Sequence, residues 1–204
     1  MKRMLIVVAL VLSMLAPAWP QTKPQASKTR DVLGLYEKFL AVEEKLDRLD
    51  KRFQQLEKDL KPFVESDSAL NQLAGAAMMV GALKLWILEA RELATEEDSL
   101  IARLVTASSS LMGDSGRHAD EGVRLLREQH VYLKQGIERA ERLIAQMTDL
   151  FRSIREDRLA DLPELLDERE FAAQIKAIDE LEQRRELVLA RGKDAFLRFK
   201  ATSK

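Results

Sequence analysis

The chain of 204 residues has no cysteine and little glycine, proline or aromatic side chain, with 8 Gly, 5 Pro and 5% aromatics. Without cysteine there can be no disulfide, so the stability of the fold must come from packing. Sheets need turns rich in Gly, Pro and Asn, and their scarcity therefore favours long helices. The length suits one domain with a sizeable core.

The chain also lacks an excess of charge of either sign, because 33 Lys and Arg stand against 34 Asp and Glu. Binding of nucleic acid needs a clustered basic face, and the two signs are instead interleaved along the chain. We therefore expect no nucleic-acid partner. The interleaved charges are typical of solvated helix surfaces with pairs four residues apart.

Residues for catalysis are equally scarce. There is no cysteine nucleophile and no Gly-rich phosphate loop, and only His118 and His130 titrate near neutral pH without a perturbed pKa. A metal at His118 with Asp114 and Asp120 is less favoured than an ordinary polar helix start. His130 is interpreted as a hydrogen-bonded core or rim residue, and Arg185 as a snorkelling or ion-paired one. We expect no enzyme, no cofactor and no metal site.

Two stretches place apolar residues at steps of three and four, which lays them along one face of a helix. Outward positions carry charges, among them Glu43, Glu44 and Asp47. The first stretch is Val32, Leu35, Phe39, Val42, Leu46, Leu49, Phe53, Leu56, Leu60 and Phe63. The second is Val123, Leu126, His130, Leu133, Ile137, Ala140, Ile144, Met147, Phe151 and Ile154.

We call each such apolar face a seam. The seams and the breaks between them predict four helices, at about 31–61, 68–112, 118–160 and 163–200. Pro62 disfavours helix in the residue before it, and the glycines at 113 and 116 mark a turn. Thr95 and Asp98 could restart the second helix, although its apolar spacing continues through them. Short connections make sequential helices antiparallel. The expected fold is all-α, an up-down-up-down antiparallel four-helix bundle of long helices with coiled-coil-like seams.

The first 18 residues have the pattern of a bacterial secretory signal peptide. Lys2 and Arg3 precede an apolar run, and Ala16-Pro17-Ala18 supplies small residues at a cleavage site. No cysteine follows to carry a lipid, so we do not expect a lipoprotein. Residues 19–30 are polar and predict a flexible lead-in, which leaves 31–204 as a single helical domain. The expected location is the periplasm or the extracellular space.

Residues 73–88, LAGAAMMVGALKLWIL, form the unusual stretch of the chain because they are apolar around almost the whole helix circumference. The favoured interpretation is a central helix packed through Ala and Gly. A membrane-inserting segment is the second interpretation, in which Lys84 would snorkel. A pocket for an apolar ligand or lipid, lined by Met78, Met79 and Trp86, is the third.

Helix lengths suggest a place for a partner. If the first helix begins at Asp31, it stops short of the 113–117 turn and leaves that end with three helices or fewer. A groove there would accept a partner's amphipathic helix or a second copy of the chain. Two alternatives would close it: Trp19 and the lead-in fold over it, or the second helix bends at Thr95. The expected lining is Leu100, Ile101, Leu104, Leu111, Val123, Leu126, Phe196 and Phe199.

The leading hypothesis is therefore a non-enzymatic secreted or periplasmic interaction protein, with a protein partner or self-association. In architecture alone the chain is broadly similar to small helical subunits and chaperones of bacterial secretion systems, a resemblance that transfers no residue roles. Such a protein would act as an adaptor, a chaperone or a component of an envelope or secretion assembly. The alternative is a membrane-active or lipid-binding protein that uses residues 73–88.

Overall fold

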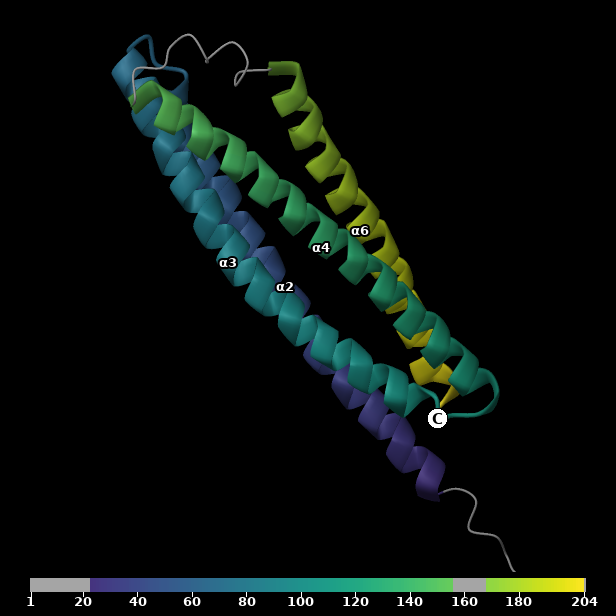
Figure 1. Cartoon of the computed structure of the whole chain (residues 1–204). Coiled ribbons are helices and arrows are strands. Elements are labelled where there is room, and N and C mark those ends of the chain that lie inside the picture. The colour runs from purple at the N-terminus through teal and green to yellow at the C-terminus, as the bar shows by residue number, and fades with distance from the viewer. Residues whose placement is uncertain (1–22, 156–167, 204) are drawn as a thin grey trace, which may run out of the picture.

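The computed structural model describes residues 23–155 and 168–203, and every element within them is a helix. The helices are α2 (Lys23–Val64), α3 (Ala69–Ser108), α4 (Gly113–Arg155) and α6 (Glu168–Thr202). Figure 1 shows four long rods, each running opposite to the one before it. The prediction of an all-α chain is confirmed over these residues. The expected signal peptide, 1–18, lies outside the described residues.

Helix α2 begins earlier than predicted, at Lys23 rather than Asp31. Residues 23–30 of the expected flexible lead-in are therefore helical. Pro24 falls in the first turn, where backbone N–H groups have no partner within the helix. The N–H that proline lacks therefore costs no hydrogen bond there. Pro62 stands near the other end of α2, and the helix continues past it to Val64.

Helix α3 is continuous through residues 95–98, so the predicted alternative of a restart there is wrong. The Thr95 hydroxyl donates to the carbonyl of Arg91 at 2.9 Å, a bond within the helix rather than a cap. The predicted break at 113–116 lies slightly too late, because α3 ends at Ser108 and α4 already begins at Gly113. Gly113 has a φ of 69°, the left-handed conformation that glycine adopts without strain.

The core consists of two main apolar layers along the length of the molecule. The lower layer lies at the end of the molecule that holds the α3–α4 turn in Figure 1. It joins all four helices through side chains such as Phe39, Leu104, Leu126 and Phe199. The upper layer is centred on the three helices α2, α3 and α4. Its buried members are Leu46, Leu49, Ile87, Ala90, Ala94, Leu133, Ile137 and Ala140.

Consecutive helices pack extensively against each other, whereas α2 and α6 scarcely approach. Side chains bridge these two helices at the lower end, where the rings of Tyr36 and Phe196 stack with centroids 3.8 Å apart. Further up, the predicted seam of α2 emerges from the core, and Leu56 and Phe63 are 40% and 45% exposed. Figure 1 shows the upper end of α6 standing apart from α2 and α3. The molecule therefore has an open side between α2 and α6.

Candidate functional site

A set of buried polar side chains separates the two apolar layers. We call it the polar layer: Glu43, Glu97, Gln129, His130 and Arg185. Each described helix contributes at least one member. Arg185 of α6 forms a short ion pair with Glu43 of α2, and its Nε donates to Oε1 of Gln129 at 3.1 Å. Arg185 thus connects α6 to both α2 and α4.

Glu97 of α3 is held from α4 by two contacts. Gln129 Nε2 donates to Glu97 Oε2 at 3.2 Å, and His130 Nδ1 lies 2.9 Å from the same oxygen. The other ring nitrogen of His130 is 2.9 Å from Asp98 Oδ1, and Asp98 also pairs with Lys134. The network therefore runs from the interior to an ion pair at the surface.

The buried carboxyl groups of Glu43 and Glu97 lie close enough for each to affect the pKa of the other. Burial raises the pKa of Glu43 to about 8, against the opposing charge of Arg185. Burial also raises the pKa of Glu97 and lowers that of His130. The Arg185 cation opposes this effect of burial on the pKa of both carboxyl groups.

This arrangement can hold a proton and fix the register of the four helices. Buried ionic groups of this kind can specify which helix faces meet, because any slip leaves a charge unpaired. Within residues 23–155 and 168–203, no group of three or more His, Asp or Glu side chains is placed to hold a metal ion. Asp114 instead pairs with Arg117.

A cleft of about 620 Å³ lies along the open side between α2 and α6. Its lining is acidic, with Glu43, Glu44, Asp47, Asp50, Glu182 and Glu186 against Lys51, Arg185 and Lys193. Burial raises the pKa of Asp50, and burial together with the nearby charge of Asp50 raises that of Glu182. The carboxylates of the two helices therefore repel each other across the cleft.

An apolar cavity of about 420 Å³ adjoins this cleft and lies between all four helices. Trp86 forms part of its wall, with its Nε1 donating to Asp50 Oδ1 at 2.8 Å and its ring centroid 6.4 Å from that of Phe53. The apolar lining is completed by Met79, Leu83, Leu133, Ala140, Leu143, Met147, Ile175, Ile178 and Leu181. Its size falls within the range of small-molecule sites, about 300–1,000 Å³.

The third feature is the solvent side of α3. Of residues 73–88, only Gly75, Val80 and Ile87 are buried, so the interpretation of this segment as a tightly packed central helix is wrong. By length and composition alone, Asn71–Ser108 is the one helix in the described part of the chain that could cross a membrane, and 22% of its most apolar window is buried. We call its exposed apolar residues the outer face of α3: Ala74, Met78, Gly81, Leu85 and Leu88.

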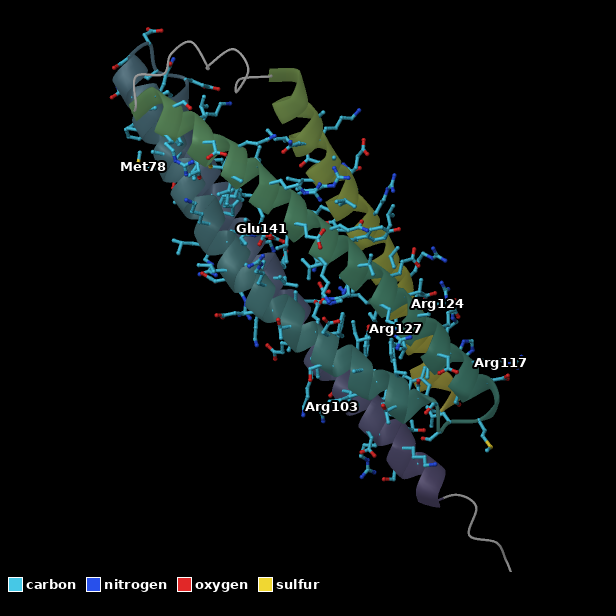
Figure 2. The ribbon with its side chains drawn as sticks, in the orientation of Figure 1. Met78, Arg103, Arg117, Arg124, Arg127 and Glu141 are labelled. Carbon is cyan, nitrogen blue, oxygen red and sulfur yellow. The ribbon has the colours of Figure 1, made fainter. Side chains whose placement is uncertain are left out.

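Residues on the outer face follow steps of four and three, the same spacing as a core seam. Met78, Leu85 and Leu88 are 45%, 64% and 58% exposed. Figure 2 places Met78 on the side of α3 turned away from α6. On the opposite side, Glu141 of α4 pairs with Arg91 of α3 (Figure 2). Helix α3 thus has an inner face in the core and a second apolar face in solvent.

The four residues of the 73–88 segment that were predicted to contact a membrane or an apolar ligand lie in two different places. Met79 and Trp86 line the apolar cavity, whereas Met78 is on the outer face and Lys84 is exposed beside it. The eight predicted groove residues do not line a groove. Leu100, Ile101, Leu104, Leu111, Val123, Leu126, Phe196 and Phe199 are all buried in the lower apolar layer. The register of α2 against α3 explains this correction: Lys45 pairs with Glu96 and Arg52 with Glu89. This register brings the beginning of α2, with Val32, Tyr36 and Phe39, into the same cluster as these residues.

Sequence reasoning missed Glu43, Glu97 and Gln129. Glu43 was assigned to an outward position, and the structure places it at 6% exposure. Arg185 and His130 were the available signals, since both interrupt apolar seams. Arg185 is indeed paired with a carboxylate of a neighbouring helix, and His130 contacts Glu97. The sequence did not show which carboxylates lie at the level of these residues.

Comparison with known proteins finds no match: no family model, no curated protein and no solved structure is similar to this chain.

Proposed function

We propose that the protein is a non-enzymatic interaction protein of the bacterial envelope that docks a helix of a partner protein on the outer face of α3. Following the signal-peptide pattern, it would act in the periplasm or outside the cell, as an adaptor, chaperone or assembly component. The up-down-up-down bundle with its seams would serve as the scaffold. The observation that carries the proposal is an apolar seam exposed to solvent.

The spacing of the outer face favours a helix as the occupant. Steps of four and three match the seam that one helix presents to another. Gly81 stands in its middle, and a Cβ built there meets nothing within 4 Å, so the fold of this chain does not require glycine at that position. A glycine instead allows a second helix to approach closely. From Ala74 to Leu88 the face is about 21 Å long, which suits a small, transient interface.

Photo-crosslinking tests this proposal directly. A photoreactive amino acid at position 85 should give a protein adduct in the envelope, and Leu88→Glu should abolish it. The matched control is position 187, where Leu187 is 67% exposed on α6 and away from this face. No adduct at position 85, or the same adduct from position 187, would reject the docking face.

Vesicle flotation and sedimentation velocity separate the alternatives. We expect the purified protein not to float with vesicles and to sediment as a monomer. Flotation that is lost in Leu85→Glu/Leu88→Glu would replace the proposal with membrane binding by the 73–88 segment. A dimer that the same double variant dissociates would make a second copy of this chain the partner.

A further inference from the structure

The apolar cavity and the acidic cleft adjoin each other. Asp50, Gln54, Glu182 and Arg185 line both. A ligand that spans both would meet carboxylates in the cleft and apolar side chains in the cavity. This division of a site into a charged mouth and an apolar interior matches an amphiphilic molecule.

The interior suits an extended apolar chain. Its lining on α4 runs from Tyr132 to Met147, about 22 Å of helix. Met79 and Met147 have flexible, polarizable side chains that adapt to ligands of different shape. Phe53 and Trp86 supply rigid aromatic walls of the same cavity. A long alkyl chain fits this shape better than a compact ring system.

Gly136 keeps part of the cavity empty. It lies on the cavity wall in the interior of α4, and a Cβ built there meets nothing within 4 Å. Glycine is unfavourable in the middle of a helix, and nothing in the described packing demands it here. A larger side chain at this position would fill the space that a ligand would occupy.

Charge determines which head group the mouth accepts. The cavity lining includes Asp50, Glu57, Asp179 and Glu182 against the single cation Arg185. Arg185 is already engaged by Glu43 and Gln129 within the polar layer. Burial and the charge of Asp50 raise the pKa of Glu182, which shows that a further negative charge here would be unfavourable. A cation would relieve this repulsion.

We propose that the cleft and the cavity together bind a small cationic amphiphile, with its alkyl chain in the apolar cavity and its ammonium head between Asp50 and Glu182. The site faces inward from α3, whereas the outer face of α3 is turned to solvent. The two sites are therefore independent, and binding of the amphiphile goes beyond the proposed docking function.

Fluorescence of Trp86 provides the measurement. The chain has two tryptophans, so Trp19→Phe leaves Trp86 as the only reporter at the cavity wall. Dodecylamine, kept below its micellar concentration, should change this fluorescence saturably. Dodecanoic acid has the same chain and the opposite charge, and it should bind at least about tenfold more weakly. Butylamine has the charge without the chain and should not bind. Equal binding of the amine and the acid would overturn the proposal.

Variants assign the two parts of the site. Asp50→Asn and Glu182→Gln should each weaken dodecylamine binding about three- to tenfold, without strengthening that of butylamine. Gly136→Leu should abolish binding and leave the melting temperature unchanged or higher. Undiminished binding in Gly136→Leu, or in both charge variants, would refute the site. Leu85→Glu/Leu88→Glu should bind the amine normally, so failure of the docking proposal would leave this result unaffected.

Discussion

At the scale of single residues, Arg185 is the side chain on which the polar layer depends. It joins α6 to Glu43 of α2 and to Gln129 of α4. Removing only the cation leaves buried carboxyl groups without a counter-charge, at a cost of about 3–5 kcal/mol. We expect Arg185→Met to lower the free energy of unfolding by this amount in urea titrations.

The adjacent position supplies a matched control for this prediction. Arg184 carries the same side chain but is exposed. Arg184→Met should therefore change the free energy of unfolding by less than about 0.5 kcal/mol. If the two variants were equally stable, the pairing of Arg185 would contribute nothing to the fold.

Glu43 predicts a specific dependence of stability on pH. Its pKa rises from 4.5 to about 8 on folding, so between these values the folded chain holds a proton that the unfolded chain has released. The contribution of Glu43 to the free energy of unfolding is complete at low pH. It is lost as the pH rises through the pKa that Glu43 has in the folded chain. We expect the free energy of unfolding to fall by about 1 kcal/mol between about pH 7 and pH 9.

The variant Glu43→Gln isolates this effect, because it cannot titrate. His130 acts in a different window: burial lowers its pKa from 6.5, so its contribution is lost as pH falls below that value. The decline of stability above neutral pH should therefore disappear in Glu43→Gln. Urea titrations across this range measure it, and a persisting decline would place the buried proton elsewhere.

At the scale of elements, α2 shows how one helix face decides stability. Leu46 is fully buried in the upper apolar layer, whereas its neighbour Asp47 is exposed and pairs with Lys51 at 2.7 Å. Leu46→Asp buries an unpaired charge and should cost more than about 3 kcal/mol. Asp47→Ala loses only a surface pair, worth less than about 0.5 kcal/mol. Thermal unfolding of both variants checks this, and similar melting temperatures would show that α2 is rotated differently.

Helix α3 differs from α2 because it is apolar on two faces. Its inner face buries Val80, Ile87, Ala90 and Ala94, while the outer face remains in solvent. Exposed apolar patches of this kind commonly mark interaction surfaces. The most apolar stretch of the described helices is therefore not the most buried one.

At the scale of the whole molecule, the open side between α2 and α6 predicts uneven local stability. Ile175, near the beginning of α6, is 50% exposed, whereas Phe199 near its end is fully buried. Segments with few buried contacts open at a lower free energy than the global unfolding. Hydrogen exchange should therefore be faster in the peptide around Ile175 than in the peptide around Phe199. Equal protection of the two peptides would mean that α6 packs uniformly.

The sequence alone determined that the chain is helical and where most of its helices lie. Apolar steps of three and four can be satisfied only by a helix, and the scarcity of Gly and Pro left few positions for breaks. Errors were confined to the ends, such as Lys23 and Gly113, where local propensities are weak. The predicted groove had a different cause: the register of α2 against α3, which the pairs Lys45–Glu96 and Arg52–Glu89 fix, could not be counted from helix lengths.

Only the tertiary structure decided which side chains meet. Glu43 lies on α2 among other charged residues, and nothing in its neighbourhood distinguishes it from Glu44. It is buried because α6 places Arg185 at the same level, a contact between residues 142 positions apart. The periodicity of a helix reports which residues share a face, but not which face a distant helix will cover. For the same reason, the sequence located the apolar segment 73–88, and the fold decided which part lines a cavity and which part faces solvent.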